Sequence, residues 1–456
     1  MPIPRYAEWM LEQEARALLT RLARVKPFAL QESMLLAASL LPDAQVAIEN
    51  FLTRGRRQLR VLVNAFIEWL HSPEAAWANA EEGQRRFTIL RLRFNGVLTQ
   101  FDVFENVITQ RSENETGVWL SGLDVASTDA LRLSVPYYVQ PPVICYLDRG
   151  VGAAIRRART RLPGGGDSPV AIVKVPRERM VGSGIASSLF HEVGHQAAAL
   201  LELIPLLRNT LKRVIRRSPQ DAEAWRLWER WISEIVADFW SVARVGVAST
   251  MGLMGVVSLP RAFVFRVNPD DPHPTPWIRV KLSAAIGQAL YPQTVWEQLA
   301  RLWDSYYPLE GLPEDQRRVI AMLERTMPDL IGVLTNLRPP ALRGRSLFEA
   351  LDTRELLPAR LQALLARWRV APQEMYETRP ILVFAAIGQG RADGRITPEE
   401  EGMVLGKLLT HWAVESTLQA AAGCTAGRQH RCRCRGRMNR DEQITTTTRR
   451  MSWKIQ

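Results

Sequence analysis

The residues His191-Glu192-Val193-Gly194-His195 combine side chains that can bind and use a metal ion. Two histidines four positions apart on a helix lie on one face, about one turn from each other, so both imidazoles can reach a single ion. Glu192 points about a quarter turn away from them, where it can touch a water on the metal instead of the metal. This H-E-x-x-H arrangement is typical of zinc hydrolases and provides two ligands, a general base and an open coordination position. The alternative is an ordinary helix that carries the pattern by chance.

A catalytic zinc site of this kind needs a third protein ligand, and helix lengths indicate where to look for it. We expect the helix that carries the motif to span residues 184–215 and a second helix to span residues 218–245. If the two helices pack antiparallel, a residue level with His195 lies about as far beyond the turn as His195 lies before it. This places the third ligand within residues 234–240. The carboxylates in this window are Glu234 and Asp238, which are four positions apart and therefore share one helix face.

These two carboxylates are predicted to have different tasks. We predict that Glu234 is the third ligand and that Asp238 accepts the free N–H of a ligating histidine, which fixes the tautomer of that histidine. The alternative is a surface pair in which Arg230 forms an ordinary salt bridge with Glu234. Gly194 costs about 1 kcal/mol against alanine in a helix interior, so we expect it to permit close approach of another backbone segment.

With these residues in place, the chain resembles the gluzincin metallopeptidases, whose signature is H-E-x-x-H followed by a helix that bears E-x-x-x-D. Residues 191–195 (HEVGH) and 234–238 (EIVAD) match it, and residues 273–279 (HPTPWIR) are similar to the H-P-x-x-x-x-R element of one gluzincin branch. The resemblance covers about residues 140–300. Ser233 departs from it, because many gluzincins have asparagine before the ligand glutamate.

The resemblance implies a zincin-like metallopeptidase core with one Zn²⁺ per chain, held by His191, His195 and Glu234. It further implies that His273 stabilises the oxyanion and that Arg279 pairs with carboxylates of the site. The other interpretation of His273 is a loop histidine in a proline-rich connection.

The expected function is that of a zinc metalloendopeptidase, a hydrolase that acts on a peptide or protein substrate. Glu192 would take a proton from the attacking water and deliver it to the leaving amine, while zinc and His273 stabilise the oxyanion. The strand around residues 172–175 would hold an extended peptide by edge pairing. The alternative is a non-catalytic, protease-like interaction or scaffold protein that forms part of a larger assembly. A structural site, however, has no use for a base such as Glu192.

The elements that position this site are predicted to be mainly α-helical with a small β-sheet. The sheet is expected from the β-branched runs at residues 143–147 and 170–176, and Ser183 is expected to cap the helix that follows. We divide the chain into an N-terminal helical region (1–134), a zincin-like metallopeptidase domain (135–305), a C-terminal helical region (306–423) and a basic, disordered tail (424–456). The flanking helical regions are candidate surfaces for protein partners.

Composition and charge argue against several other classes of protein, namely secreted, membrane-spanning and disulfide-rich proteins. The chain of 456 residues is 46% hydrophobic and 23% charged, as expected of a globular protein. We expect no secretory signal and no membrane span, since the most apolar window, residues 245–259, is too short to cross a bilayer. Four cysteines without a disulfide framework agree with a reducing, cytoplasmic location. The net charge is +12, but the tail holds nine Lys or Arg against two acids, so the body does not indicate nucleic-acid binding. Nucleic-acid binding through the arginine-rich tail is a further alternative function.

Residues 393–396 together with Glu400 resemble the second half of a calcium-binding EF-hand loop. Gln389 and Arg391 occupy the first and third loop positions, and an arginine there replaces an anionic ligand by a cation, which argues against calcium. We predict instead a capping box at the start of a helix, with Thr397 as the N-cap and Glu400 three positions later.

Overall fold

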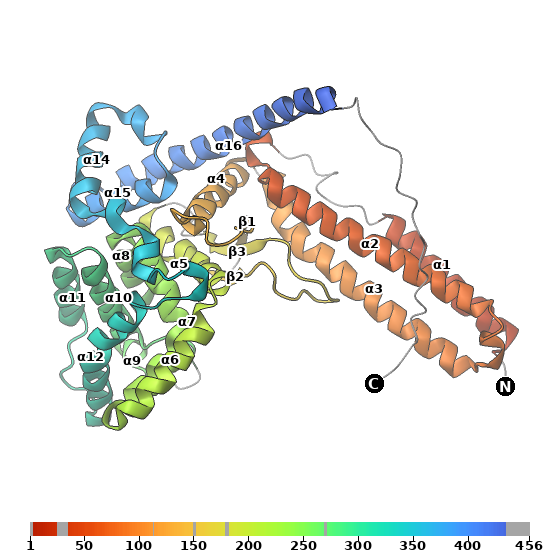
Figure 1. The fold of residues 1–456 in the computed structure, drawn as a ribbon, viewed down its shortest axis with the longest axis horizontal. Helices are drawn as coiled ribbons and strands as arrows, with labels where there is room; N and C mark the ends of the chain where they lie inside the picture. Colours follow the sequence, from red (N-terminus) through yellow and green to blue (C-terminus); the bar gives the residue numbers. More distant parts are fainter. Residues whose placement is uncertain are drawn as a thin grey trace.

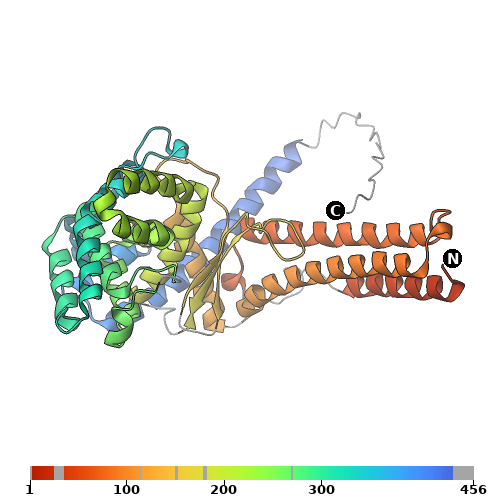
Figure 2. The same cartoon turned by 90° about the horizontal axis from the view of Figure 1, so that it is seen from below.

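The computed structural model describes residues 3–24, 35–112, 114–148, 152–177, 182–268 and 271–434. Within them the protein is mainly α-helical with a small three-stranded sheet, as the sequence predicts. Figures 1 and 2 show a long helical arm formed by the N-terminal part and a larger helical body, with the sheet where the two meet.

The arm consists of α1 (Arg5–Arg24), α2 (Pro42–Leu70) and α3 (Ala80–Ile108), which lie side by side. These helices share a hydrophobic core that is separate from the core of the body, with Leu18, Phe87 and other apolar residues at its centre. The arm is therefore held together by its own packing over much of its length.

The body contains the remaining helices, and one hydrophobic core joins the helices of the candidate site to helices near the C-terminus. The helices are α4 (Asn114–Leu131), α5 (Ser183–Leu200), α6 (Leu203–Arg217), α7 (Ala222–Val245), α8 (Val247–Val257), α9 (Arg261–Val264), α10 (Pro276–Leu290), α11 (Thr294–Tyr306), α12 (Glu314–Thr335), α13 (Leu347–Leu351), α14 (Pro358–Val370), α15 (Pro380–Ala392) and α16 (Pro398–Cys434). Short 3₁₀ turns lie at residues 36–38, 75–77, 109–112, 219–221, 340–342, 353–356 and 372–375.

The sheet has the strand order β1-β3-β2, with β1 (Val143–Asp148) parallel and β2 (Ala154–Arg156) antiparallel to β3 (Ala171–Pro176). Since β3 pairs with a strand on each side, the predicted edge pairing at residues 172–175 is wrong. Five of the six residues of β3 are buried, as is usual for a central strand covered on both faces. β2, which pairs with β3 alone among the described residues, lies at the edge.

The predicted helix over residues 184–215 is interrupted, which is a second correction. α5 ends at Leu200 and α6 begins at Leu203, with Glu202 between them in a left-handed conformation (φ 53°). The cause is Pro205, because a proline inside a continuous helix lacks the N–H that would bond to the carbonyl four residues earlier and clashes with it. In the first turn of a new helix the same proline is tolerated.

The start of α5 also differs from the prediction. The helix begins at Ser183 itself, and Gly182 occupies the N-cap position with φ at 120°. Glycine adopts this backbone conformation without the steric cost that other residues have, which explains why the glycine and not the serine precedes the helix.

α16 begins with the predicted capping box and ends beyond the predicted boundary. The Glu400 backbone N–H donates to Thr397 Oγ1 over 3.2 Å, and the Thr397 N–H donates to the Glu400 carboxylate over 2.9 Å. The helix continues through Cys434, so residues 424–434, predicted to belong to a disordered tail, are helical, and 435–456 lie outside the described residues. Among the described helices, none combines the length and apolarity that crossing a membrane requires.

Candidate metal site

α5 places His191 and His195 on one face, one turn apart, with their ring centroids 4.9 Å from each other. Gly194, between them, faces α7: a Cβ at this position would lie 2.9 Å from both the Cα and the carbonyl oxygen of Ala237. The predicted close approach at Gly194 is thus confirmed. It brings α7 near enough to α5 for Glu234, one turn before Ala237, to face both histidines.

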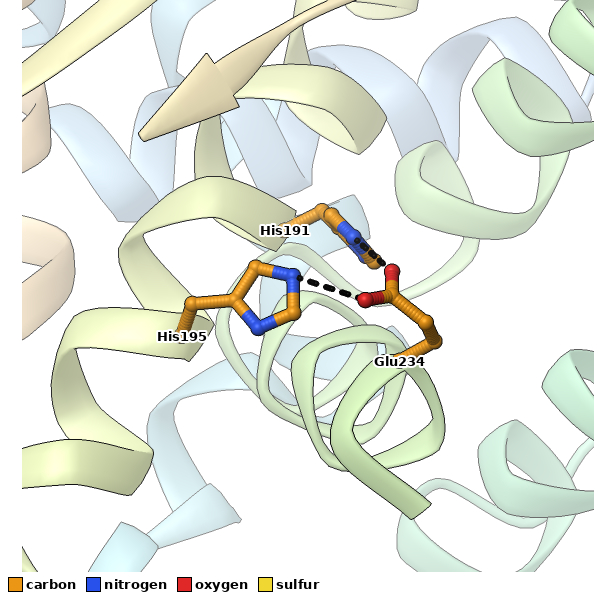
Figure 3. Close-up of side chains that lie close together, drawn as sticks. All are labelled: His191, His195 and Glu234. Atoms are coloured by element: carbon orange, nitrogen blue, oxygen red, sulfur yellow. Dashed lines mark hydrogen bonds and ion pairs between the residues drawn. The ribbon is translucent and has the colours of Figure 1, made fainter. Parts of the chain in front are cut away.

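Glu234 points at the two imidazoles from α7, as Figure 3 shows. Its Oε2 lies 3.1 Å from Nε2 of His191, and its Oε1 lies 3.5 Å from Nε2 of His195. One ligand atom from each of the three residues fits within 4.8 Å of the others. Their mutual distances and their chemistry, two imidazole nitrogens and a carboxylate oxygen, fit a metal ion.

Asp238 and Arg279 form a layer behind His191. Oδ1 of Asp238 accepts from Nδ1 of His191 over 2.7 Å. The Arg279 guanidinium, from α10, donates to Oδ2 of the same carboxylate over 2.6 Å and to Oδ1 over 2.9 Å. This chain of contacts fixes the ring of His191 so that its other nitrogen, Nε2, faces Glu234.

The electrostatics of the site favour the charged forms of His191 and Glu234, although both side chains are buried. Burial disfavours the imidazolium of His191, but the Asp238 carboxylate beside it and the hydrogen bond to Glu234 together outweigh this effect and raise the pKa of His191 to about 9. Burial would also raise the pKa of Glu234, yet hydrogen bonds from His191, His195 and His273 hold this pKa far below its usual range. The cluster therefore attracts a cation at its centre once the imidazole proton is released.

Glu192 lies beside the three candidate ligands without joining them. Its side chain is buried, with 8% exposed, and it lines a cleft of about 340 Å³ together with His195, Glu234 and His273. In the described part of the chain Glu192 forms no ion pair. Burial raises the pKa of its carboxyl above the usual range, against the opposing effect of the two motif histidines. A carboxylate that is available in a cleft and has a raised pKa is suited to accept a proton.

His273 reaches the cleft from the segment before α10. Its Nε2 lies 3.2 Å from Oε2 of Glu234, and its side chain is 46% exposed. Asp271 holds the ring from the other side, since the carboxylate accepts from Nδ1 of His273 and from the His273 backbone N–H, each over 2.9 Å. His273 is thus a half-exposed donor at the entrance to the cleft.

Comparisons with protein families, with curated proteins and with solved structures give no match to this chain. The argument for its function therefore rests on the geometry of the site itself.

All seven residues that the sequence nominates come together: His191, Glu192, His195, Glu234, Asp238, His273 and Arg279. Sequence reasoning missed Asp271 and the contact of Ser233, whose Oγ lies 3.5 Å from Nδ1 of His195. It also missed β2, whose Ala154 and Ile155 line the cleft. Asp271 precedes Pro272 and His273, a turn-forming pattern that could have indicated a contact between the carboxylate and a nearby backbone N–H; β2, three residues long, gives no such signal.

Proposed function

We propose that the protein is a zinc-dependent metallopeptidase that hydrolyses peptide bonds. The observation that carries the proposal is the position of Glu192, a buried carboxylate that forms no ion pair within the described residues and shares one cleft with His195 and Glu234 of the candidate metal-binding group. A site that only stabilised the fold would need the ligands and no additional base. The resemblance of residues 191–195, 234–238 and 273–279 to the gluzincins supports the same conclusion.

His191, His195 and Glu234 would hold the ion. Two imidazoles and one carboxylate are a ligand set typical of catalytic zinc, which keeps a further position open. Zn²⁺ bound there supplies a Lewis acid that polarises the scissile carbonyl and makes a water acidic near neutral pH.

The chain's own residues account for the proton transfers. Glu192 takes the proton of the attacking water and delivers it to the amine that leaves. His273, at the entrance to the cleft, donates a hydrogen bond to the carbonyl oxygen as negative charge develops on it. Asp238 and Arg279 keep His191 oriented and do not take part in proton transfer.

Peptide binding is assigned to β2. Among the described residues no strand pairs with the side of β2 that faces away from β3, and Ala154 and Ile155 line the cleft with Glu192. An extended peptide can add to such an edge as a further strand, which brings its backbone carbonyls alongside the base.

The test replaces the base and leaves the ligands intact. Glu192→Gln in the zinc-loaded protein is expected to lower the hydrolysis of a mixture of unstructured peptides by about a hundredfold or more, with unchanged zinc content. Glu223→Gln, an exposed carboxylate at the start of the same helix as Glu234, is the matched control. Peptide cleavage is followed by mass spectrometry. Full activity in Glu192→Gln with zinc bound would show that Glu192 is not the base.

A scaffold role is the second candidate, and the arm is the observation that favours it. Tyr6, Trp9 and Trp77 are 74%, 51% and 92% exposed, and they lie in the first turns of α1 and in the connection between α2 and α3, at the end of the arm far from the body (Figure 2). Exposed aromatic side chains are enriched where proteins bind partners. If the zinc-loaded protein cleaves no peptide, this function becomes the better explanation.

A further inference from the structure

A second cavity lies across β2 from the cleft of the candidate metal site. It measures about 530 Å³ and lies between the sheet and α3, where Val103 and Asn106 contribute to its wall. Ala154, Ile155 and Arg157 line both this cavity and the cleft that contains Glu192. The edge strand β2 and the residue after it therefore form a partition between the two spaces.

The second cavity is strongly cationic. The described residues of its lining include Arg156, Arg157, Arg161 and Lys174 and no Asp or Glu. In the part of the chain that the structure describes, none of these four side chains forms an ion pair with a carboxylate. Tyr146 also lines the cavity. Clustered cations without acidic partners raise the local potential and attract an anionic group. We name this space the cationic cavity.

The segment that carries two of the arginines is fixed on both sides. Gln196, the neighbour of His195 on α5, accepts the Ala158 N–H over 2.8 Å. On α3, the buried Gln100 side chain donates to the carbonyls of Pro163 and Gly165 over 2.6 and 2.7 Å. Arg157 and Arg161 are therefore carried by a backbone that is anchored to α5 and to α3, which reduces the entropy that a ligand must offset.

The register of the sheet determines which side chains of β2 and β3 face the cationic cavity and which face α5. Ala154 pairs with Lys174 and Arg156 pairs with Ile172, whereas Ile155 pairs with Val173. Side chains of paired residues lie on the same face of a sheet and alternate along each strand. Arg156 and Lys174 thus share the face of the cationic cavity. The Ile155 side chain belongs to the opposite face, where it packs against the core of the body and α5 contacts the sheet; Ile155 borders the cavity as well as the cleft because β2 separates the two spaces.

A peptide strand paired to the free edge of β2 would alternate in the same way. Every second side chain would project to the face of α5 and the candidate metal ligands, and the side chains between them would project to the cationic cavity. We propose that the cationic cavity binds Asp or Glu side chains of the substrate, so that the protein selects peptides with acidic residues at alternate positions around the cleaved bond. This inference rests on the proposed peptidase function and on β2 as the substrate-binding edge.

The first experiment that tests this inference is a glutamate scan of a peptide substrate. Glutamate is placed at each position of a neutral peptide that the zinc-loaded protein cleaves, with glutamine at the same position as the isosteric reference. The ratio of kcat/KM for Glu over Gln is expected to be about tenfold or more at alternate positions, as for a charge-assisted hydrogen bond, and close to one between them. A ratio near one everywhere, or one that rises equally at every position, would overturn the inference and leave the peptidase proposal standing.

The second experiment changes the charge of the cationic cavity by substitution of its arginines. Arg156→Glu and Arg161→Glu are each expected to lower the Glu-over-Gln ratio by about tenfold, and Arg156→Lys is expected to retain much of it. Arg208→Glu, an exposed arginine on α6, changes the net charge by the same amount and is expected to leave the ratio unchanged. Equal effects of Arg156→Glu and Arg208→Glu would mean that overall charge is responsible and would contradict the inference.

A binding measurement separates this inference from the proposed function. Fluorescence anisotropy with a labelled acidic peptide and its Gln counterpart is done on the Glu192→Gln protein, where turnover does not interfere. Tighter binding of the acidic peptide that Arg156→Glu removes would support the cationic cavity even if no peptide is ever cleaved. No difference between the two peptides would overturn it. Tighter binding of a single-stranded oligonucleotide through the same arginines would also overturn it, because the partner would then be a nucleic acid.

Discussion

At the scale of single residues, Asp238 connects the candidate metal ligands to α10. It accepts from His191 over 2.7 Å, and Arg279 binds both of its oxygens. Residues in this position orient a ligating histidine and increase its basicity. Their effect is therefore on metal affinity, not on proton transfer.

Replacing Asp238 by Asn is expected to lower zinc affinity by about 10- to 100-fold, because the amide keeps the shape but loses the charge that supports His191. The affinity is measured by competition with a chromophoric chelator. Circular dichroism checks that the variant is folded, since Arg279 keeps a polar partner in Asn but loses its ion pair. Zinc affinity equal to that of the wild type would contradict the assigned role.

Metal uptake is also expected to release a proton. With a pKa of about 9, His191 is protonated at pH 7 when no metal is bound, and the proton must leave before Nε2 can bind an ion. Affinity should therefore rise about tenfold per pH unit towards pH 9 and then level off. Isothermal titration calorimetry at pH 7, in buffers of different ionisation enthalpy, reports the number of protons released. Release of none would show that His191 is already neutral.

At the scale of elements, the site depends on how closely α5 and α7 approach. Gly194 permits that approach, because a Cβ there would lie within 3.0 Å of atoms of Ala237 and Trp240. These neighbours are backbone atoms and a Cβ, which cannot move aside without moving α7. The distance between the histidines and Glu234 is thus set partly by a glycine.

Gly194→Ala is expected to destabilise the protein by about 1–3 kcal/mol, as overpacking of a core does, although alanine has the higher helix propensity. Zinc affinity should fall with it. Gly184→Ala in the same helix, where the added Cβ meets no atom within 4 Å, is the matched control and should not destabilise. Thermal unfolding of the metal-free proteins measures the difference. A Gly194→Ala protein as stable as the control would refute the close contact.

The sequence predicted those parts of the site that depend on local spacing. His191, Glu192 and His195 belong to one helix. Glu234 could be found by counting residues because α7 packs along both α6 and α5. The break at Glu202 therefore did not change which residues of α7 lie beside the two histidines. The break itself followed from Pro205. The identity of the edge strand depends on pairing between distant segments, which the pattern of residues 172–175 alone could not determine.

At the scale of the whole molecule, the arm and the site rest on different cores. Phe87 belongs to the core that α1, α2 and α3 share. Phe384, on α15, belongs to the body and contacts Phe190, with ring centroids 5.3 Å apart. Phe190 directly precedes His191, so packing in the body bears on the ligands in a way that packing in the arm does not.

Phe87→Ala and Phe384→Ala each remove a buried phenylalanine, which typically costs about 3–5 kcal/mol. Phe87→Ala is expected to increase hydrogen exchange in α1–α3 and to leave zinc affinity unchanged. Phe384→Ala is expected to increase exchange in α5 and to weaken zinc binding. Hydrogen–deuterium exchange with mass spectrometry distinguishes the two. Equal loss of zinc affinity in both variants would show that the arm and the body are coupled more tightly than their cores indicate.

The central claim is that His191, His195 and Glu234 bind a catalytic metal ion, and elemental analysis of the purified protein tests it most directly. The wild type is compared with a His191→Ala, His195→Ala double variant, after both have been supplied with zinc and dialysed. We predict one zinc per chain in the wild type and none in the folded variant. A well-folded wild type that retains no metal after zinc has been supplied would contradict the account.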